Sequence, residues 1–374
     1  MGFNMLPYQL KEKIDASTDQ KMNYAAYMQE VLYNPVNGYY MREKEKVGTK
    51  GDFLTSSNIH DIYGKVFAKL FVNYIYQTGI PPFFLEIGGG NGRFARHFLE
   101  EIRELDKQLY QSLTYYMIEA SPYHLKLQEK EIPADAPIRY YRSLDEMPQH
   151  TFEGMIFSNE LFDALPVHVI EKNGSDIVEV FVTLDSNEGL KEKKSPLQNK
   201  DIREYLTSNK LDLSEGQRVE VPLAMLEYAS TVAEKLNRGS IITVDYGYRL
   251  AELSREELKT GSLRGYYQHS MIPNPLLHPY EMDLTTHVHL DSLEDAYSQK
   301  ALTHICTKRQ GEFLVKAGIM EYLQEHYNPN PFSEKSKRNR AIRSLIMDGS
   351  WSNSFYVLIH EKGADGWSKQ IKSD

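Results

Sequence analysis

The sequence has little of what marks a secreted or membrane protein. Its 374 residues include a single cysteine, Cys306, which excludes an intrachain disulfide and a cysteine-based metal site. No run approaches the roughly 18 consecutive apolar residues that a membrane span needs, and residues 1–14 lack the apolar core of a signal peptide. Because a lone thiol also suits a reducing compartment, we expect a cytoplasmic protein without a membrane span.

An excess of positive charge is missing as well. The formal net charge is -9, which argues against long duplex nucleic acid as a partner. The hydrophobic fraction of 41% is sufficient for a sizeable core, and the length suits one large domain with insertions or two modest domains. Nothing in the composition specifies an oligomeric state.

From residue 83 onward, short apolar segments alternate with segments of helical periodicity. Strand–helix alternation of this kind predicts an α/β fold with a mostly parallel sheet and helices on both faces. The strands are predicted at 83–87, 113–118, 138–141, 154–158, 240–244 and 355–360. The helices are predicted at 93–105, 122–130 and 222–236 and near 290–303, 309–326 and 334–347.

Four regions depart from this alternation. Residues 1–80 are predicted to form an N-terminal helical region that packs on the cleft of a main domain at 81–374. The N-terminal region is expected to hold amphipathic helices at 22–33 and 59–77 and a Gly/Ser/Thr loop at 48–57. A hairpin with an Asn-Gly turn is predicted at 167–182. Insertions are expected at about 185–215, which is polar, and at 246–288, which is long and irregular.

The sharpest local signal is a glycine-rich turn that follows the first predicted strand and opens a helix. Such a turn lets a ligand approach the main chain, and the helix start adds unpaired N–H donors. The dinucleotide pattern Gly-x-Gly-x-x-Gly fails because Arg93 occupies its last position, and a Walker loop is excluded because no Gly-Lys-Ser/Thr follows. A different pattern, Glu-x-Gly-x-Gly-x-Gly, is met by Glu86, Gly88, Gly90 and Gly92.

An acidic residue just before the turn suits a cation better than a polyphosphate, so Glu86 favours the sulfonium of S-adenosylmethionine (SAM). Glu119 ends the next predicted strand, where a carboxylate can hold both ribose hydroxyls of an adenosine. NAD enzymes also place an acid there, so Glu119 indicates an adenosine nucleoside more than SAM itself. The alternatives are a glycine-rich connection without a ligand and a surface glutamate on a loop.

Polar residues also follow the later strands, at the edge where open α/β sheets bind ligands. A methyltransferase must position the nucleophile and, if needed, take its proton. For a guanidinium acceptor, carboxylates are the natural partners, and the candidates are Glu160, Asp163 and Asp245. Asn159 and Asp163 could instead cap a helix.

The long segment at 246–288 and the residue just after it carry four histidines: His269, His278, His287 and His289. Their spacing matches no zinc pattern, and no cysteine or acidic cluster assists, so we predict no metal site. His287 is a candidate general base. The alternative role for His287 is a hydrogen-bonded residue that organises the loop.

Together these motifs resemble the MidA-like family of SAM-dependent methyltransferases, over roughly residues 22–361. The matching elements run in the family's order: Asn34-Pro-x-x-Gly-Tyr-Tyr40, Gly51-Asp-Phe-Leu-Thr-Ser56, Glu86-Ile-Gly-x-Gly-x-Gly92, Asn159-Glu-Leu-Phe-Asp-Ala-Leu-Pro-Val167, Asp245-Tyr-Gly-Tyr248, Gly261-Ser-Leu-Arg-Gly-Tyr-Tyr-x-His269, His278-Pro-x-Glu-x-Asp-Leu-Thr-x-His-Val288 and Gln310-Gly-Glu-Phe-Leu314. At Ser57-Asn58 the family usually has Pro-Glu, so this chain lacks that carboxylate.

The resemblance implies a class I methyltransferase (Rossmann-like) fold with added helices and an inserted hairpin. It implies SAM contacts by Gly88, Gly90, Gly92 and Glu119, and a cleft formed in part by residues 51–56, with Thr55, and by residues 159–163, with Asn159. A mitochondrial member of the family is a protein arginine methyltransferase needed for respiratory complex I assembly. A protein substrate with an arginine acceptor is therefore the leading expectation.

Three alternatives stay open at this point. The chain could bind SAM as an assembly factor without catalysis, or it could methylate a small molecule. An NAD-dependent dehydrogenase is a more distant alternative, because Arg93 breaks the dinucleotide pattern.

Overall fold

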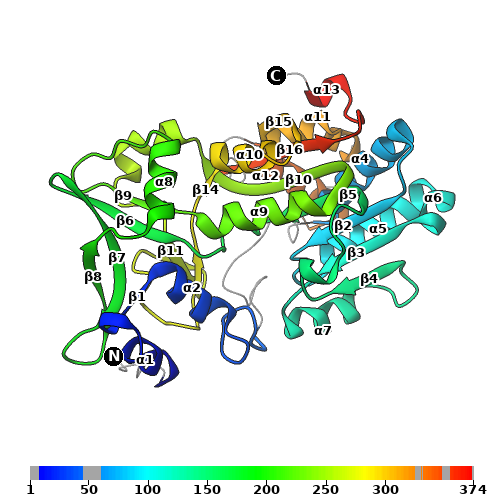
Figure 1. Ribbon diagram of the computed structural model, residues 1–374. Helices are drawn as coiled ribbons and strands as arrows, with labels where there is room; N and C mark the ends of the chain where they lie inside the picture. Colours follow the sequence, from blue (N-terminus) through cyan, green and yellow to red (C-terminus); the bar gives the residue numbers. More distant parts are fainter. Residues whose placement is uncertain (1–7, 45–59, 325–329, 331, 348–353, 373–374) are drawn as a thin grey trace.

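The computed structural model describes residues 8–44, 60–324, 330, 332–347 and 354–372 (Figure 1). Its largest sheet has the strand order β15-β16-β10-β5-β2-β3-β4, and β14 pairs with β10 beside that path. The strands are β2 (Phe83–Ile87), β3 (Thr114–Ile118), β4 (Ile138–Tyr141), β5 (Phe152–Asn159), β10 (Leu236–Tyr248), β14 (Val288–His289), β15 (Thr303–Arg309) and β16 (Phe355–Lys362). The pairs from β10 through β4 are parallel, and β16 joins β10 and β15 antiparallel.

Apolar side chains that alternate along these strands feed two separate cores, one on each face of the sheet. On β5, Met155 and Phe157 face one core, whereas Ile156 between them faces the other. The first core is covered by α4 (Ile62–Thr78), α5 (Arg93–Leu105), α11 (Gln310–Lys316) and α12 (Glu334–Ile346). The second is covered by α9 (Leu223–Lys235) and α10 (Leu290–Ser298).

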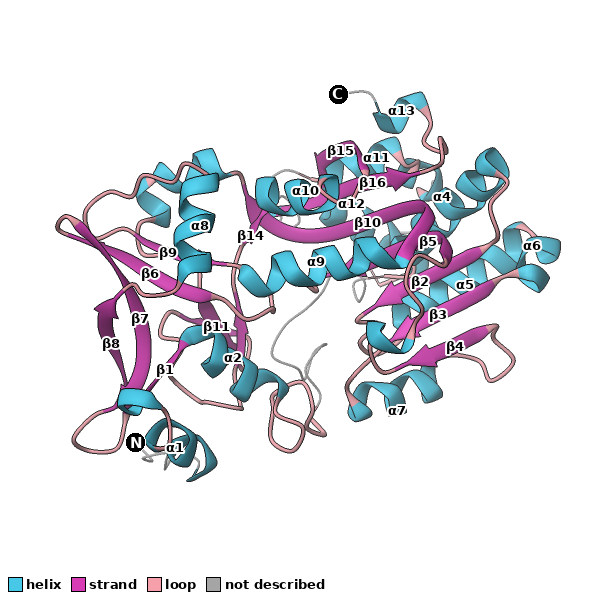
Figure 2. Ribbon diagram, in the orientation of Figure 1, coloured by secondary structure: helices cyan, strands magenta, loops and turns pink. Residues whose placement is uncertain are grey.

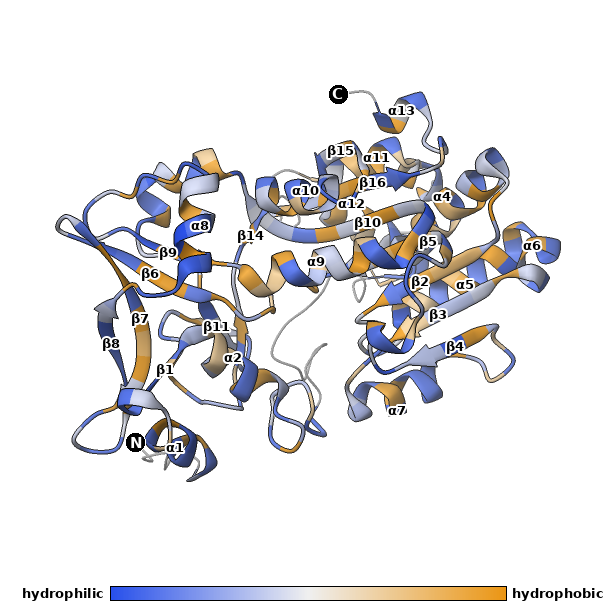
Figure 3. Ribbon diagram, viewed as in Figure 1, coloured by the Kyte–Doolittle hydropathy of each residue, from blue (hydrophilic) through white to orange (hydrophobic). Residues whose placement is uncertain are grey.

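The covering helices have the residue pattern that burial of one face requires. Figure 3 shows hydrophilic and hydrophobic residues alternating along α9. The buried residues of this helix follow helical spacing: Met225, Ala229, Val232, Ala233 and Lys235. The shorter helices α6 (Lys107–Ser112), α7 (Pro122–Glu131) and α13 (Lys369–Lys372) complete the large lobe.

A second, smaller lobe is built on an antiparallel sheet of order β1-β7-β6-β9, with β8 paired to β7. Its strands are β1 (Lys21–Asn23), β6 (His168–Asn173), β7 (Asp176–Leu184), β8 (Leu190–Pro196) and β9 (Arg218–Val221). The helices α1 (Tyr8–Asp15) and α2 (Tyr24–Tyr33) share a core with one face, and α8 (Lys200–Ser208) shares a core with the other. Figure 2 shows this lobe at the left, beside the large sheet.

A third, small sheet lies against the second lobe. It has the order β12-β11-β13 and consists of β11 (Arg264–Tyr267), β12 (Ser270–Ile272) and β13 (Asp283–Thr285). Leu284 of β13 belongs to the same core as α1 and α2. The segment at 246–288, which the sequence predicts to be irregular, therefore contains two short 3-10 helices followed by three ordered strands.

The predicted α/β sheet is confirmed, and the strands at 83–87 and 138–141 have the predicted bounds. The polar region expected as an insertion at about 185–215 contains β8 and α8. Two predictions were wrong in detail. The helix expected to reach residue 303 ends at Ser298, before β15. The hairpin turn lies one residue later than predicted, at Gly174 and Ser175, because Asn173 pairs with Asp176.

The residues grouped by sequence into an N-terminal helical region belong to two different cores. Helix α4 packs on the large sheet, whereas α1, β1 and α2 pack with the second lobe. The first two residues of the helix predicted at 22–33 belong instead to strand β1, which pairs with β7. The loop expected at 48–57 lies outside the described residues.

Gly239 lies in the large sheet at a position where a side chain has no room, and this generates a stability prediction. Gly239 of β10 pairs with Gly154 of β5, and a Cβ on Gly239 would lie 1.8 Å from the carbonyl oxygen of Gly154. Neither strand can move away without breaking the backbone hydrogen bonds between β5 and β10. We therefore expect Gly239→Ala to lower the free energy of unfolding by about 3 kcal/mol in chemical denaturation.

Gly174→Ala is the matched control. The backbone of Gly174 is left-handed, with φ 60°, but an added Cβ there would meet no atom within 4 Å. This variant should lose only about 1 kcal/mol. Equal losses for the two variants would contradict the packing argument.

Candidate functional site

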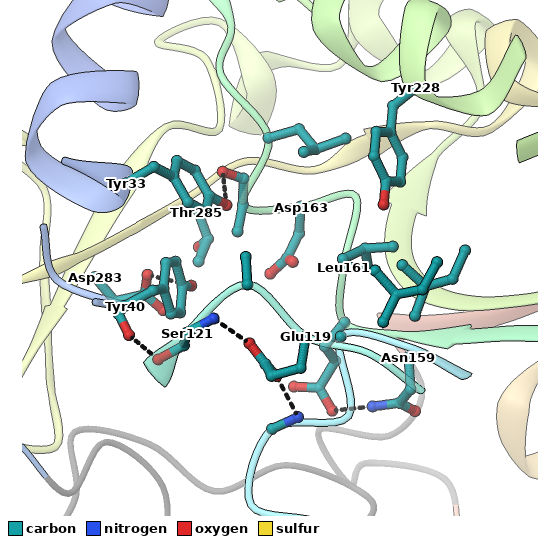
Figure 4. A pocket seen from close by; sticks show the side chains of 18 of the residues that line it. Tyr33, Tyr40, Glu119, Ser121, Asn159, Leu161, Asp163, Tyr228, Asp283 and Thr285 are labelled. Carbon is teal, nitrogen blue, oxygen red and sulfur yellow. Dashed lines mark hydrogen bonds between the residues drawn. The ribbon is translucent and has the colours of Figure 1, made fainter. Parts of the chain in front are cut away.

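The carboxyl ends of β2, β3 and β5 open into a cavity of about 1360 Å³. Its large-lobe wall is formed by the glycine turn after β2, the end of β3 and residues 159–161 and 163–166. The opposite wall is formed by α2 and by the small third sheet. The two lobes thus enclose one cavity between them, and Figure 4 shows part of its lining.

The glycine turn has the left-handed backbone that glycine permits. The φ angles of Gly88, Gly90 and Gly92 are 78°, 52° and 82°. Gly88 and Gly90 line the cavity, and a Cβ on Gly90 would meet no atom within 4 Å, so a ligand can approach the main chain there. Gly92 lies behind the turn, against Gln128, and is not part of the cavity wall.

Glu119 connects the glycine turn to the end of β3. Its carboxylate accepts hydrogen bonds from the backbone N–H groups of Gly90, at 3.1 Å, and Ser121, at 2.8 Å. His124 Nδ1 lies 3.4 Å from the same carboxylate. Glu119 is buried and lines the cavity, where a strand-terminal carboxylate can hold ribose hydroxyls.

Glu86, at the start of the turn motif, lies deeper than Glu119. The hydroxyl of Tyr115 donates to its carboxyl group at 2.6 Å. Burial, with a smaller contribution from the charge of Glu119, raises the pKa of Glu86 to about 8, although the Tyr115 hydrogen bond opposes this shift. Glu86 is therefore mostly protonated at neutral pH, unlike the charged residue expected from the sequence.

Asn159 and Glu160 follow β5 at the cavity wall. Asn159 accepts from the Tyr63 hydroxyl at 2.7 Å and donates to Glu160 Oε1 at 3.0 Å. Glu160 has a left-handed backbone, with φ 52°, and its N–H donates to the carbonyl of Val244. Residues other than glycine adopt this conformation at a cost, and the predicted role of Glu160 stays a prediction.

Asp163 and Asp245 have different environments, although the sequence gives them the same predicted role. Asp163 is buried at the cavity wall, and burial raises its pKa to about 6. Asp245 is fully buried behind the wall, where one oxygen accepts from the N–H groups of Leu161, Phe162 and Asp163. Asp245 thus holds the loop that presents Asp163, rather than contacting an acceptor directly as expected.

His287 lines the cavity, as predicted, but its surroundings disfavour a role as a base. Its Nε2 contacts the Arg264 guanidinium, and its backbone N–H donates to Ser262 Oγ at 3.0 Å. Burial, together with the charge of Arg264, lowers the pKa of His287 to about 3. These contacts favour the alternative role considered for His287, which is to organise the loop.

The sequence reasoning missed several lining residues, most of which come from the second lobe and the third sheet. Tyr33 and Tyr40 line the cavity, as do Asp283 and Thr285 of β13 and Tyr228 of α9. The Tyr40 hydroxyl donates to Asp283 at 2.6 Å, and the Tyr33 hydroxyl donates to the Ala164 carbonyl at 3.0 Å. Asp283 and Thr285 lie in a motif that carries the family resemblance, and that motif was the available signal.

Thr55, the remaining predicted cofactor contact, lies outside the described residues. Within the described ranges, no group of three or more His, Cys, Asp or Glu side chains is arranged to hold a metal ion. No helix among those residues has both the length and the apolar character needed to cross a bilayer.

Comparison with protein families decides the cofactor. A family model described as "Putative S-adenosyl-L-methionine-dependent methyltransferase" matches residues 66–306, which include the glycine turn, Glu119 and residues 159–163. The chain belongs to this family. The resemblance to the MidA-like methyltransferases is thereby confirmed, and SAM is the cofactor of the family. The open backbone at Gly90 and the carboxylate of Glu119 in the cavity fit that ligand.

Curated relatives and solved structures resemble this MidA-like chain over most of its length. "Protein arginine methyltransferase NDUFAF7 homolog, mitochondrial" of Drosophila melanogaster is 29% identical, covering 88% of this chain and 79% of the relative. The Homo sapiens "Protein arginine methyltransferase NDUFAF7, mitochondrial" is 27% identical, covering 90% and 80%.

Among solved structures, a COG1565 superfamily member from Burkholderia thailandensis bound to S-adenosyl-homocysteine matches with a TM-score of 0.88 and 24% identity. The alignment covers 98% of this chain and 94% of that chain. This likeness establishes that both lobes belong to one shared fold.

The buried carboxyl group of Glu86 generates a prediction on pH dependence. Its folded-state pKa of about 8 exceeds the unfolded value of 4.5, so the folded protein holds a proton that the unfolded chain has lost. Stability therefore falls as pH rises between these values, by up to about 1.4 kcal/mol per pH unit. We expect Glu86→Gln to remove this loss, as measured by denaturant unfolding between about pH 5 and pH 8.

Glu227→Gln is the matched control, because Glu227 is exposed. It should retain the wild-type slope. A Glu86→Gln variant whose stability changes with pH as in the wild type would contradict the raised pKa of Glu86.

Proposed function

We propose that this chain is a SAM-dependent methyltransferase that methylates a protein side chain, with arginine as the acceptor. The observation that supports a cationic acceptor is the excess of carboxyl groups inside the cavity. The acidic residues that are buried or half-buried there are Glu86, Glu119, Glu160, Asp163 and Asp283. Among the described residues, the arginines that line the cavity are Arg264, which is half-buried, and Arg142, which is exposed.

Buried carboxylates destabilise a protein unless a cation or hydrogen-bond donors compensate their charge. Glu86 is largely neutral, and Glu119 is occupied by backbone N–H groups. The other two carboxyl groups of this part of the cavity are those of Asp163, which belongs to the loop that Asp245 holds, and Glu160, which lies next to that loop. A guanidinium group supplies both the charge and the planar donors that such carboxylates bind best. The arginine methyltransferase names of the curated relatives agree with this chemistry.

SAM supplies an electrophilic methyl group on its sulfonium sulfur. The chain must hold the acceptor nitrogen in line with that group and take the proton that the nitrogen loses. Asp163 is suited to both tasks, because its pKa of about 6 lies close to neutral pH and its carboxyl group faces the cavity (Figure 4). Asp245 positions Asp163 through the backbone of the intervening loop.

Two other functions use the same cofactor site. A SAM-binding assembly factor would need no proton acceptor, and a small-molecule methyltransferase would not need to admit a polypeptide. Action in the cytoplasm stays a prediction from the sequence.

The proposal is tested with purified protein, labelled SAM and a lysate from cells that lack the protein. We expect label in protein, recovered by mass spectrometry as methylarginine. Asp163→Asn should reduce the labelling rate by about 100-fold because the proton acceptor is lost. Glu204→Gln, at an exposed position outside the cavity lining, serves as the control for loss of one charge.

Label in metabolites would support a small-molecule methyltransferase instead. SAM binding without any label transfer, together with an Asp163→Asn variant that keeps its cellular role, would support a non-catalytic assembly factor.

A further inference from the structure

The second lobe presents a pair of tyrosine rings to the cavity, opposite the cofactor motifs. Tyr33 is the last residue of α2, and Tyr40 follows the turn after that helix. Their rings stack, with centroids 5.4 Å apart and an interplanar angle of 26°. Figure 4 shows both rings on one side of the Asp163 carboxyl group, with Tyr228 and Leu161 on the other side. Aromatic faces beside buried carboxylates form a favourable site for a delocalised cation.

Carboxyl groups from both lobes act on these rings. Asp283 of β13 is only 3% exposed and accepts the Tyr40 hydroxyl at 2.6 Å. Burial, together with the charges of Asp283 and Asp163, raises the pKa of Tyr33 and of Tyr40 well above its usual value. Asp283 and Asp163 therefore act electrostatically on the same pair of phenols, although they come from different lobes.

Two buried side chains in this part of the cavity can take a further hydrogen bond. They are Asp163, which is 5% exposed, and Thr285, which is 4% exposed. Both interact with the Tyr246 hydroxyl, and Asp163 Oδ1 and Thr285 Oγ1 have no other partner among the described residues. Because buried polar atoms are almost always hydrogen-bonded and both residues line the cavity, a ligand can supply a further donor there.

Hydrogen bonds between the lobes fix this group relative to the cofactor motifs. Ser121 Oγ donates to the Tyr40 carbonyl at 2.6 Å, while the Ser121 N–H donates to Glu119. The Thr286 N–H donates to the Asp163 carbonyl at 2.9 Å, and the Tyr33 hydroxyl donates to the Ala164 carbonyl. The pair of rings of Tyr33 and Tyr40, which we call the tyrosine wall, is thus held in a defined position beside Glu119 and Asp163.

We propose that Asp283 and Thr285, with the Tyr33–Tyr40 ring pair, form the subsite that recognises the guanidinium group of the acceptor together with Asp163. This inference rests on the proposed function and extends it. The large lobe binds the cofactor, and the second lobe selects the acceptor. A guanidinium offers planar N–H donors for the carboxylates and for Thr285, and its flat face stacks on a tyrosine ring. An ammonium lacks that flat face, and a urea lacks the charge.

The probe for this subsite is Nα-acetyl-L-arginine methylamide, titrated calorimetrically into protein saturated with S-adenosyl-homocysteine. The matched probes are the lysine and citrulline counterparts. We expect the wild-type protein to bind the arginine probe at least tenfold more tightly than the citrulline probe, and several-fold more tightly than the lysine probe. Asp283→Asn should weaken arginine binding at least tenfold and change S-adenosyl-homocysteine binding less than twofold.

Tyr40→Phe distinguishes recognition from a structural role of the Tyr40–Asp283 hydrogen bond. It keeps the ring and removes the hydroxyl that occupies Asp283, so arginine binding should change no more than threefold. Glu204→Gln, at an exposed position on α8 that is not part of the cavity lining, is the control for charge and should change binding less than twofold. If Asp283→Asn fails to fold, Thr285→Val takes its place, with an expected loss of at least fivefold.

Equal losses in Tyr40→Phe and Asp283→Asn would overturn the subsite. So would unchanged arginine binding in Asp283→Asn while the wild-type protein still labels protein arginine, and in that case the proposed function would stand. A wild-type protein that binds S-adenosyl-homocysteine, shows no preference for the arginine probe and labels only metabolites would overturn the proposed function as well.

Discussion

The carboxylate of Glu119 provides the contact on which the site depends. It lies at the end of β3 and accepts hydrogen bonds from the turn after β2 and from the residue that begins the turn into α7. Parallel pairing brings the ends of β2, β3, β5 and β10 to one edge of the sheet. At that edge, Glu119 stabilises the open backbone of the glycine turn, and Ser121 carries the connection on to the second lobe through the carbonyl of Tyr40.

The second lobe turns this cofactor edge into an enclosed cavity. Helix α2 and strand β13 lie more than 240 residues apart in the sequence, yet they contribute Tyr33, Asp283 and Thr285 to the same wall. The carboxyl groups that face this wall are buried, and their charge has no matching excess of cations among the described lining residues. Such an arrangement costs stability in the free protein and favours a cation as ligand, because a bound cation relieves the desolvation of the carboxylates.

The large sheet and the cofactor motif could be predicted from the sequence because their signals are local. Apolar runs followed by a glycine turn specify β2 and α5, and Glu119 is recognisable as the residue that ends the next strand. The different roles of Asp163 and Asp245 could not be predicted, since each depends on long-range contacts: a carboxylate that ends a strand can face the cavity or bind the loop beside it. The charge state of Glu86 was also missed, because burial and the Tyr115 hydroxyl set it, and neither is visible in a local pattern. The tyrosine wall depends on contacts between residues that are distant in sequence.

Calorimetric titration of the wild-type protein and Glu119→Ala with S-adenosyl-homocysteine and with NAD tests the central claim most directly. The wild-type protein should bind S-adenosyl-homocysteine and give no heat with NAD. Loss of the carboxylate should weaken S-adenosyl-homocysteine binding about 30-fold, which corresponds to ~2 kcal/mol. Firm binding of NAD by the wild-type protein, or S-adenosyl-homocysteine binding that is unchanged in Glu119→Ala, would contradict the account.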